Sequence, residues 1–301
     1  LHNFSGSAVF ATSSTGFALN STASQDLNDG SDEYVSWTFR KEPKFFDIVT
    51  YTGTGSAQAI SHSLNSTVGM IAVKRTDTTG NWAVYHRGAN GGTDPEDYHA
   101  GFNLTDEFAN NAGYWNDTAP TTTQFTVGDD NNVNANSGTY VAYLFAHNNS
   151  DGGFGPDSED IIKCGYYTGN GSSTGPSVTL GFEPQFVMIK NASSTQNWWV
   201  LDNMRGIVSG AEDIRLKWNT SDSEDSTGDV ISLTPTGFDV TTSSSSTNTN
   251  GDTYIYMAIR RGGMNTPSTP SDVFALGARG SSTPGFTSNF PVDMFIRSYT
   301  T

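Results

Sequence analysis

The sequence predicts an all-β protein built from tandem antiparallel β-sandwich domains with a jelly-roll-like arrangement. Short β-branched and aromatic runs are separated by clusters of Gly, Asn, Asp and Ser, which is typical of many short strands. No long segment has helical periodicity. The chain also repeats itself, because the run YTGTG at 51–55 returns as YTGNG at 167–171, 116 positions later. An immunoglobulin-like sandwich is the alternative architecture.

The repeat extends well beyond this run. Lys74 corresponds to Lys190 and the pair Asn81-Trp82 to Asn197-Trp198 at the same spacing. A period of this size indicates a domain and not a short solenoid unit. The sequence therefore predicts four parts: the C-terminal part of a preceding repeat, two full sandwich repeats, and a linker with the opening of a further repeat, at 1–42, 43–150, 151–265 and 266–301. We expect the chain to be an excerpt of a longer tandem array.

The strands of the first copy are predicted in order from its apolar runs. These are FFDIVTY, VGMIAVK, WAVYH, FTV and YVAYLFA, at 45–51, 68–74, 82–86, 125–127 and 140–146. Alternation within them favours a sheet with one face on a core. The second copy repeats them in the same order. One short helical turn is expected near 212–217, with a counterpart near Glu96.

The charge balance excludes several partners. The chain has 15 Lys and Arg against 31 Asp and Glu, a formal net charge of −16, which repels phosphate backbones and anionic membranes. We expect no nucleic-acid partner. No apolar stretch reaches the roughly 20 residues of a membrane helix, so no membrane insertion is expected. The single cysteine, Cys164, excludes an intrachain disulfide and is expected to be buried.

Repeated acidic residues suggest a calcium site in each copy. Calcium prefers several carboxylate and carbonyl oxygens from one loop system. The candidate ligands are Glu96, Asp97 and Asp106 in the first copy and Glu212, Asp213 and Asp222 in the second. The alternative is that these residues cap turns through their side chains, and it is the preferred one. A further acidic cluster, Asp26, Asn28, Asp29, Asp32 and Glu33, lacks the EF-hand spacing and is interpreted as a solvated hairpin loop.

Aromatic residues suggest a surface for binding sugars. An exposed ring covers the C–H face of a sugar while polar neighbours bind its hydroxyls. The candidate residues are Trp82, Tyr85, His86, Trp198, Trp199 and Asp202. However, Trp82 and Trp198 occupy the same place in both copies, as core aromatics would. Core packing is the preferred interpretation for those two tryptophans.

The sequence carries no catalytic signature. The five histidines have no metal-ligand spacing, and neither a nucleophile elbow nor a phosphate-binding loop is present. Glu159 and Asp160 are adjacent, so on a strand they point to opposite faces and cannot alone flank a glycosidic bond. We therefore expect no catalytic residue, no enzymatic activity and no cofactor other than the calcium considered above.

Three segments resemble a repeat found in very large structural proteins of marine tailed bacteriophages, beside laminin-G-like and concanavalin-like β-sandwich domains. The matching segments are FDIVTYTGTG at 46–55, GFEPQFVMIK at 181–190 and GDTYIYMAIR at 251–260. The first copy departs from the family's glycine-aromatic-x-proline pattern at 62–66. The resemblance covers nearly the whole chain, and that family supplies no catalytic residues.

The resemblance implies a non-enzymatic virion component, in a fibre, tail appendage or capsid decoration, with a role in host adhesion. Its partners would be further copies of the chain, other virion proteins or cell-surface glycans, and its location the virion surface or the extracellular medium. The alternative function is a secreted carbohydrate-binding array of a bacterial surface or polysaccharide-degrading protein. A laminin-G-like domain associated with a glycosidase is the third.

Overall fold

The computed structural model describes residues 10–13, 16–19, 34–155, 158–207, 210 and 212–262. The chain divides into two compact units, Leu1–Lys41 and Glu42–Thr301, and each is described by itself. In the first unit, β1 (Phe10–Ser13) and β2 (Gly16–Leu19) form an antiparallel hairpin. The acidic cluster at 26–33 and the predicted opening of a further repeat at 266–301 lie outside the described residues.

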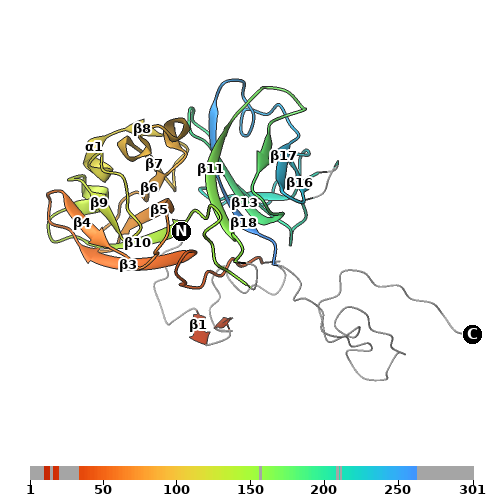
Figure 1. The fold of residues 1–301 in the computed structure, drawn as a ribbon. Helices are drawn as coiled ribbons and strands as arrows, with labels where there is room; N and C mark the ends of the chain where they lie inside the picture. Colours follow the sequence, from red (N-terminus) through yellow and green to blue (C-terminus); the bar gives the residue numbers. More distant parts are fainter. Residues whose placement is uncertain are drawn as a thin grey trace, which may run out of the picture. The chain divides into compact units, whose positions relative to one another are not determined.

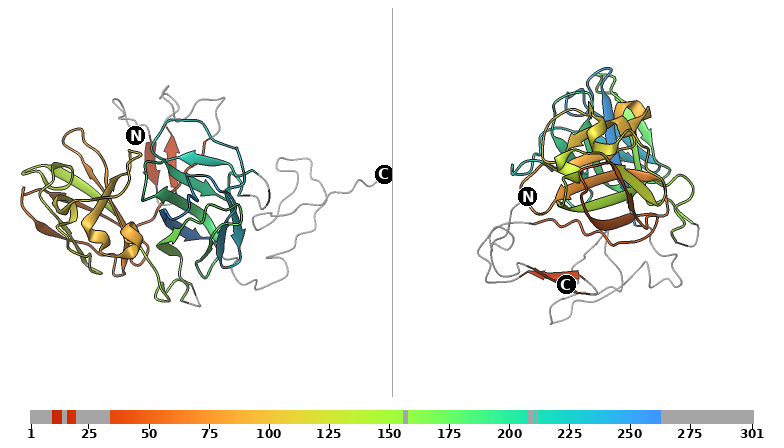
Figure 2. Two further views of the ribbon diagram at one scale, coloured as in Figure 1. Left: turned by 90° about the horizontal axis from the view of Figure 1, so that it is seen from above. Right: turned by 90° about the vertical axis from the view of Figure 1, so that its left-hand side faces the viewer.

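Two large antiparallel sheets form the second unit (Figure 1). The order of the six-stranded sheet is β3-β10-β5-β6-β7-β8, and that of the five-stranded sheet is β11-β18-β13-β14-β15. Figure 2 shows the strands of each copy as a separate group. The bounds of the first sheet are β3 (Phe46–Thr52), β5 (Val68–Arg75), β6 (Ala83–His86), β7 (Tyr98–Gly101), β8 (Ala109–Asn110) and β10 (Thr139–Ala146). Those of the second are β11 (Ile162–Thr168), β13 (Pro184–Asn191), β14 (Trp198–Asp202), β15 (Arg215–Lys217) and β18 (Thr253–Arg260).

A smaller antiparallel sheet accompanies each large one. In the first copy it consists of β4 (Gln58–Ser61) and β9 (Gln124–Val127); in the second it consists of β12 (Ser177–Thr179), β17 (Gly237–Val240) and β16 (Ile231–Thr234). Phe238 of the small sheet shares one buried core with Ile189, Leu201 and Tyr256 of the large sheet. These layers confirm the predicted all-β, sandwich-like fold, which burial of apolar side chains between the sheets stabilises.

Among the residues that the structure describes, helical structure is confined to single turns. They are η1 (Ala89–Gly92), η2 (Pro95–Asp97), α1 (Ala112–Trp115) and α2 (Asn131–Asn134). The turn expected near Glu96 is present as η2. The helical turn predicted at 212–217 is wrong, because β15 occupies this place and pairs with β14. No helix in the described part of the chain is long and apolar enough to cross a membrane.

The two copies share one strand register. Ala83 pairs with Gly101 between β6 and β7, and Trp199 pairs with Lys217 between β14 and β15, each 116 positions later. The recurrent asparagines explain why this spacing is kept. Asn103 and its counterpart Asn219 each accept a hydrogen bond from the backbone N–H of the tryptophan that precedes β6 or begins β14. Each also donates to the asparagine before that tryptophan, at 3.0 and 2.9 Å.

A fully buried asparagine closes one end of each sandwich. Asn248 accepts a hydrogen bond from the backbone N–H of Asn170 at 2.8 Å. Its amide nitrogen donates to the carbonyls of Ser172 at 2.7 Å and Thr242 at 2.8 Å. Asn134, in the first copy, bonds in the same way to the segment that follows β3. A single side chain thus satisfies several backbone groups that would otherwise be buried without partners.

A stacked pair of tyrosines lies beside each buried asparagine. The rings of Tyr51 and Tyr140 are 5.1 Å apart, and those of Tyr167 and Tyr254 are also 5.1 Å apart. The hydroxyl of Tyr254 accepts a hydrogen bond from the backbone N–H of Thr249 at 2.7 Å. These contacts fix the loop before the last strand, and they leave no room for a side chain at the first glycine of the repeated YTG run.

The two copies are in extensive contact. Trp198 is fully buried, donates from its indole nitrogen to the carbonyl of Gly101 at 3.1 Å and packs edge-on against Phe102. The buried ring of His86 donates from Nε2 to the carbonyl of Tyr256 at 3.1 Å, because its Nδ1 accepts from the backbone of Gly88. Hydrogen bonds from side chains to backbone carbonyls, together with aromatic packing, therefore hold the second copy against the first.

We expect substitution of the buried asparagine to destabilise the fold strongly. Asn248→Ala leaves the amide of Asn170 and two carbonyl groups without their partner, and should lower the free energy of unfolding by about 3 kcal/mol. The control is Asn203→Ala at an exposed position, which should change it by less than about 0.5 kcal/mol. Chemical denaturation measures both. Equal effects would contradict the role given to Asn248.

The interface between the copies should weaken in acid. Burial lowers the pKa of His86 from 6.5 to about 3, so the unfolded chain binds a proton between these values and the folded chain does not. The contribution of this histidine to stability is complete above pH 6.5 and falls by about 1.4 kcal/mol per pH unit below it. His86→Gln keeps a donor without a titrating ring. Thermal unfolding between pH 7 and 4 should show a steeper loss for the wild type, and parallel curves would contradict this prediction.

Candidate binding site

The structure does not place the predicted aromatic platform at the surface. Tyr85, His86, Trp198, Trp199 and Asp202 are all buried, and Trp82 is half-buried. Trp199 lies beneath the guanidinium of Arg215, 4.7 Å from its ring centre. Tyr85 packs against the core, Trp198 packs against the other copy, and Arg215 and Lys217 cover Trp199, whereas Trp82 lines the pocket described below.

His86 and Asp202 have structural partners. His86 is neutral and bridges the two copies. Asp202 accepts from the backbone N–H groups of Met204 and Arg205 and forms an ion pair with the Arg205 side chain at 2.7 Å. The polar groups of both side chains thus bind neighbouring groups of the protein.

The predicted calcium ligands are dispersed. Within the described ranges, no group of three His, Cys, Asp or Glu side chains is arranged to hold a metal ion. Asp213 is buried and accepts from the backbone N–H groups of Val230 and Ile231, whereas its counterpart Asp97 belongs to η2. Asp222 pairs with Lys217 at 2.7 Å. Glu96 is half-buried and Glu212 exposed, and the carboxylate of Asp106 belongs to a different site.

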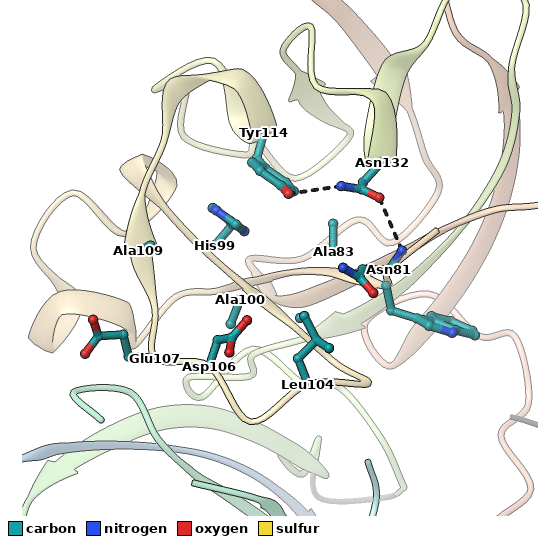
Figure 3. A pocket seen from close by; sticks show the side chains of 12 residues that line it. Asn81, Ala83, His99, Ala100, Leu104, Asp106, Glu107, Ala109, Tyr114 and Asn132 are labelled. Carbon is teal, nitrogen blue, oxygen red and sulfur yellow. Dashed lines mark hydrogen bonds between the residues drawn. The ribbon is translucent and has the colours of Figure 1, made fainter. Parts of the chain in front are cut away.

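That site is a pocket of about 170 Å³ in the first copy. It lies at the end of the large sheet, where β6, β7 and β8 meet the turns that contain α1 and α2 (Figure 3). Its lining residues are Asn81, Trp82, Ala83, His99, Ala100, Gly101, Leu104, Asp106, Glu107, Ala109, Tyr114 and Asn132. Small residues form its floor and polar groups form its walls.

The floor of the pocket is open because most of its residues have small side chains. Ala83 pairs with Gly101, and His99 pairs with Ala109 on the next strand. The side chains at 83, 99, 101 and 109 therefore share one face of the sheet. In three of these four residues, Ala83, Gly101 and Ala109, the side chain is no larger than a methyl group.

The second copy fills the same place with large side chains. The counterparts of the four floor residues are Trp199, Arg215, Lys217 and Asp225, in the same strand register. The charged groups of Arg215 and Lys217 lie 4.7 and 5.6 Å from the centre of the Trp199 ring, and Arg215 also pairs with Asp225 at 3.2 Å. The contrast shows that the fold itself does not require the pocket.

Polar side chains fix one wall. The rings of His99 and Tyr114 stack in parallel with centres 3.5 Å apart. Asn132 donates from its amide to the Tyr114 hydroxyl at 3.2 Å and accepts from the backbone N–H of Asn81 at 3.2 Å. Burial lowers the pKa of His99, although Asp130 and Asp106 oppose this shift. Its imidazole is therefore neutral at pH 7.

Two carboxylates stand at the other end of the pocket. Asp106 and Glu107 are exposed and lie away from Tyr114 and Asn132 (Figure 3). Their loop is held in place by the second copy, because the Thr105 carbonyl accepts hydrogen bonds from Lys190 Nζ at 3.1 Å and from the backbone N–H of Gln196 at 2.8 Å. The site combines aromatic rings, amides and carboxylates around a small cavity.

Comparison with protein families matches residues 2–261 to a family described as a domain of unknown function, DUF7483. The chain belongs to the DUF7483 family. This match spans both copies and most of the segment before them. No curated protein and no solved structure is significantly similar to the chain.

No direct signal in the sequence points to the pocket of this DUF7483 chain. Ala83, Gly101 and Ala109 carry no chemistry, so they attract no attention as site residues. Alignment of the two copies offers a usable signal, because Ala83 is equivalent to Trp199 and His99 is equivalent to Arg215 at the repeat spacing. Two of the lining residues are predicted from the sequence, Asp106 as a metal ligand and Trp82 as a sugar-binding ring.

We expect the His99 ring to titrate below its ordinary pKa of 6.5, because burial against Tyr114 penalises its charged form. Tyr114→Ala exposes the imidazole and should raise its pKa toward 6.5. Proton NMR of the imidazole across pH 4 to 8 measures both values. A pKa that is the same in both proteins would contradict the packing described for this wall.

Proposed function

We propose that the chain is a non-enzymatic structural and adhesion module of a tailed-phage virion, which binds a glycan through the pocket of its first copy. The observation that carries the binding part is the pocket itself, open in one copy and filled by Trp199 and Arg215 in the other. The virion part is supported by the sequence resemblance at 46–55, 181–190 and 251–260.

The chemistry of the lining supports a sugar. The rings of Tyr114 and His99 offer apolar faces, while Asn81, Asn132 and Asp106 supply amide and carboxylate groups for hydroxyls. The cavity is smaller than the roughly 300–1,000 Å³ of sites for drug-sized ligands, so it suits one ring of a glycan. Affinity for one ring would be weak, and many modules on one particle would bind strongly together.

The alternative function is a secreted carbohydrate-binding array, for which the same pocket would serve. The two proposed functions differ in assembly, because a virion module packs with further copies of the chain or with other virion proteins. Native mass spectrometry and electron microscopy of the chain distinguish them. A regular symmetric assembly supports the virion proposal, and a stable monomer favours the secreted array.

The second copy supplies the variant that tests the binding site. Ala83→Trp places in the pocket the side chain that fills the equivalent position, Trp199. The control is Ala59→Trp, the same change at an exposed position of β4. On a glycan array, wild type and A59W should bind the same glycans, and A83W should lose at least about tenfold in signal. Equal binding by A83W, or no binding by any of the three proteins, contradicts the proposed glycan site.

A further inference from the structure

The second copy also indicates what charge the ligand carries. There, the carboxylate of Asp222 pairs with Lys217 at 2.7 Å, and the Lys217 ammonium lies over the Trp199 ring. Two cations, Lys217 and Arg215, thus occupy the volume that is open in the first copy. Each is balanced by a carboxylate, Asp222 or Asp225.

The first copy keeps a carboxylate but not the cations. Asp106 is the counterpart of Asp222, whereas Gly101 stands in place of Lys217 and the neutral His99 in place of Arg215. Glu107 adds a second carboxylate where the second copy has Ser223. Within the described chain, neither carboxylate makes a hydrogen bond or an ion pair.

Lys190, which interacts electrostatically with both carboxylates, is not free to balance them. Lys190 is fully buried, and its Nζ donates to the carbonyls of Thr105, Asn191 and Ser194 at 3.1, 2.7 and 3.2 Å. An ammonium has three hydrogens, and all three are used. The field of Asp106 and Glu107 reaches this lysine, but its position is fixed by the carbonyls.

We infer that the pocket takes an amine-bearing sugar, whose ammonium group lies where Lys217 lies in the second copy, against Asp106 and Glu107, and whose ring lies beside His99 and Tyr114. This inference rests on the proposed glycan site and specifies its ligand class. A charged ligand would gain ion pairing in a partly enclosed site, and an acetylated amine would not.

Isothermal titration calorimetry at low salt with glucosamine, N-acetylglucosamine and glucose tests the inference. Glucosamine should bind about tenfold more tightly than the two neutral sugars, and added salt should reduce the difference. Asp106→Asn combined with Glu107→Gln should abolish this preference. Asp222→Asn, the same loss of charge at the equivalent place in the second copy, should leave it unchanged, and thermal unfolding checks that each variant is folded.

The outcomes separate the two proposals. Equal binding of glucosamine and N-acetylglucosamine overturns the amine assignment and leaves the glycan site intact. Binding of none of the sugars contradicts the inference and the proposed function together. Tighter binding of argininamide than of glucosamine would also overturn the inference, because the site would then prefer a basic peptide side chain to a sugar.

Discussion

A buried asparagine closes one end of each sandwich by bonding the segment that leaves the first strand of the large sheet to the loop that enters the last. Asn134 and Asn248 are fully buried, and the protein groups that they bond fix the position of both segments. The stacked tyrosines beside them lock the same loops. With first and last strands fixed in this way, the two copies keep the same strand order and register in the large sheet although many of their other residues differ.

This shared frame permits the difference between the copies on which the proposed binding site rests. The buried asparagines and stacked tyrosines hold the backbone at a distance from the pocket. The first copy can therefore have Ala83 where the second has Trp199, and Gly101 where the second has Lys217, and still form the sheet. The smaller side chains leave a cavity. The second copy then acts as a support. Lys190 and Gln196 hold the loop that carries Asp106 and Glu107, so the open copy depends on the filled copy for the position of its carboxylates.

The sequence was sufficient for the fold and insufficient for the site. Strand runs and the spacing between Asn81 and Asn197 predicted the all-β class and the repeat, because periodicity and turn chemistry are local properties. Most of the aromatic residues proposed as a platform are buried, because the sequence does not tell which face of a strand is covered. The recurrence of Trp198 in both copies favours a packed ring, but it does not tell that the ring packs against the other copy. The pocket could not be found from residue type, since three of its four floor residues are alanine or glycine.

In the proposed function, a glycan binds the first copy and is excluded from the second. NMR titration of the wild-type chain with a glycan selected on the array tests this difference between the copies. We expect the resonances of the His99 ring and the Ala83 methyl group to shift on saturation, while the indole N–H of Trp199 does not shift. Shifts at Trp199 with His99 unchanged would contradict the proposal, because the ligand would then occupy the copy whose pocket is filled.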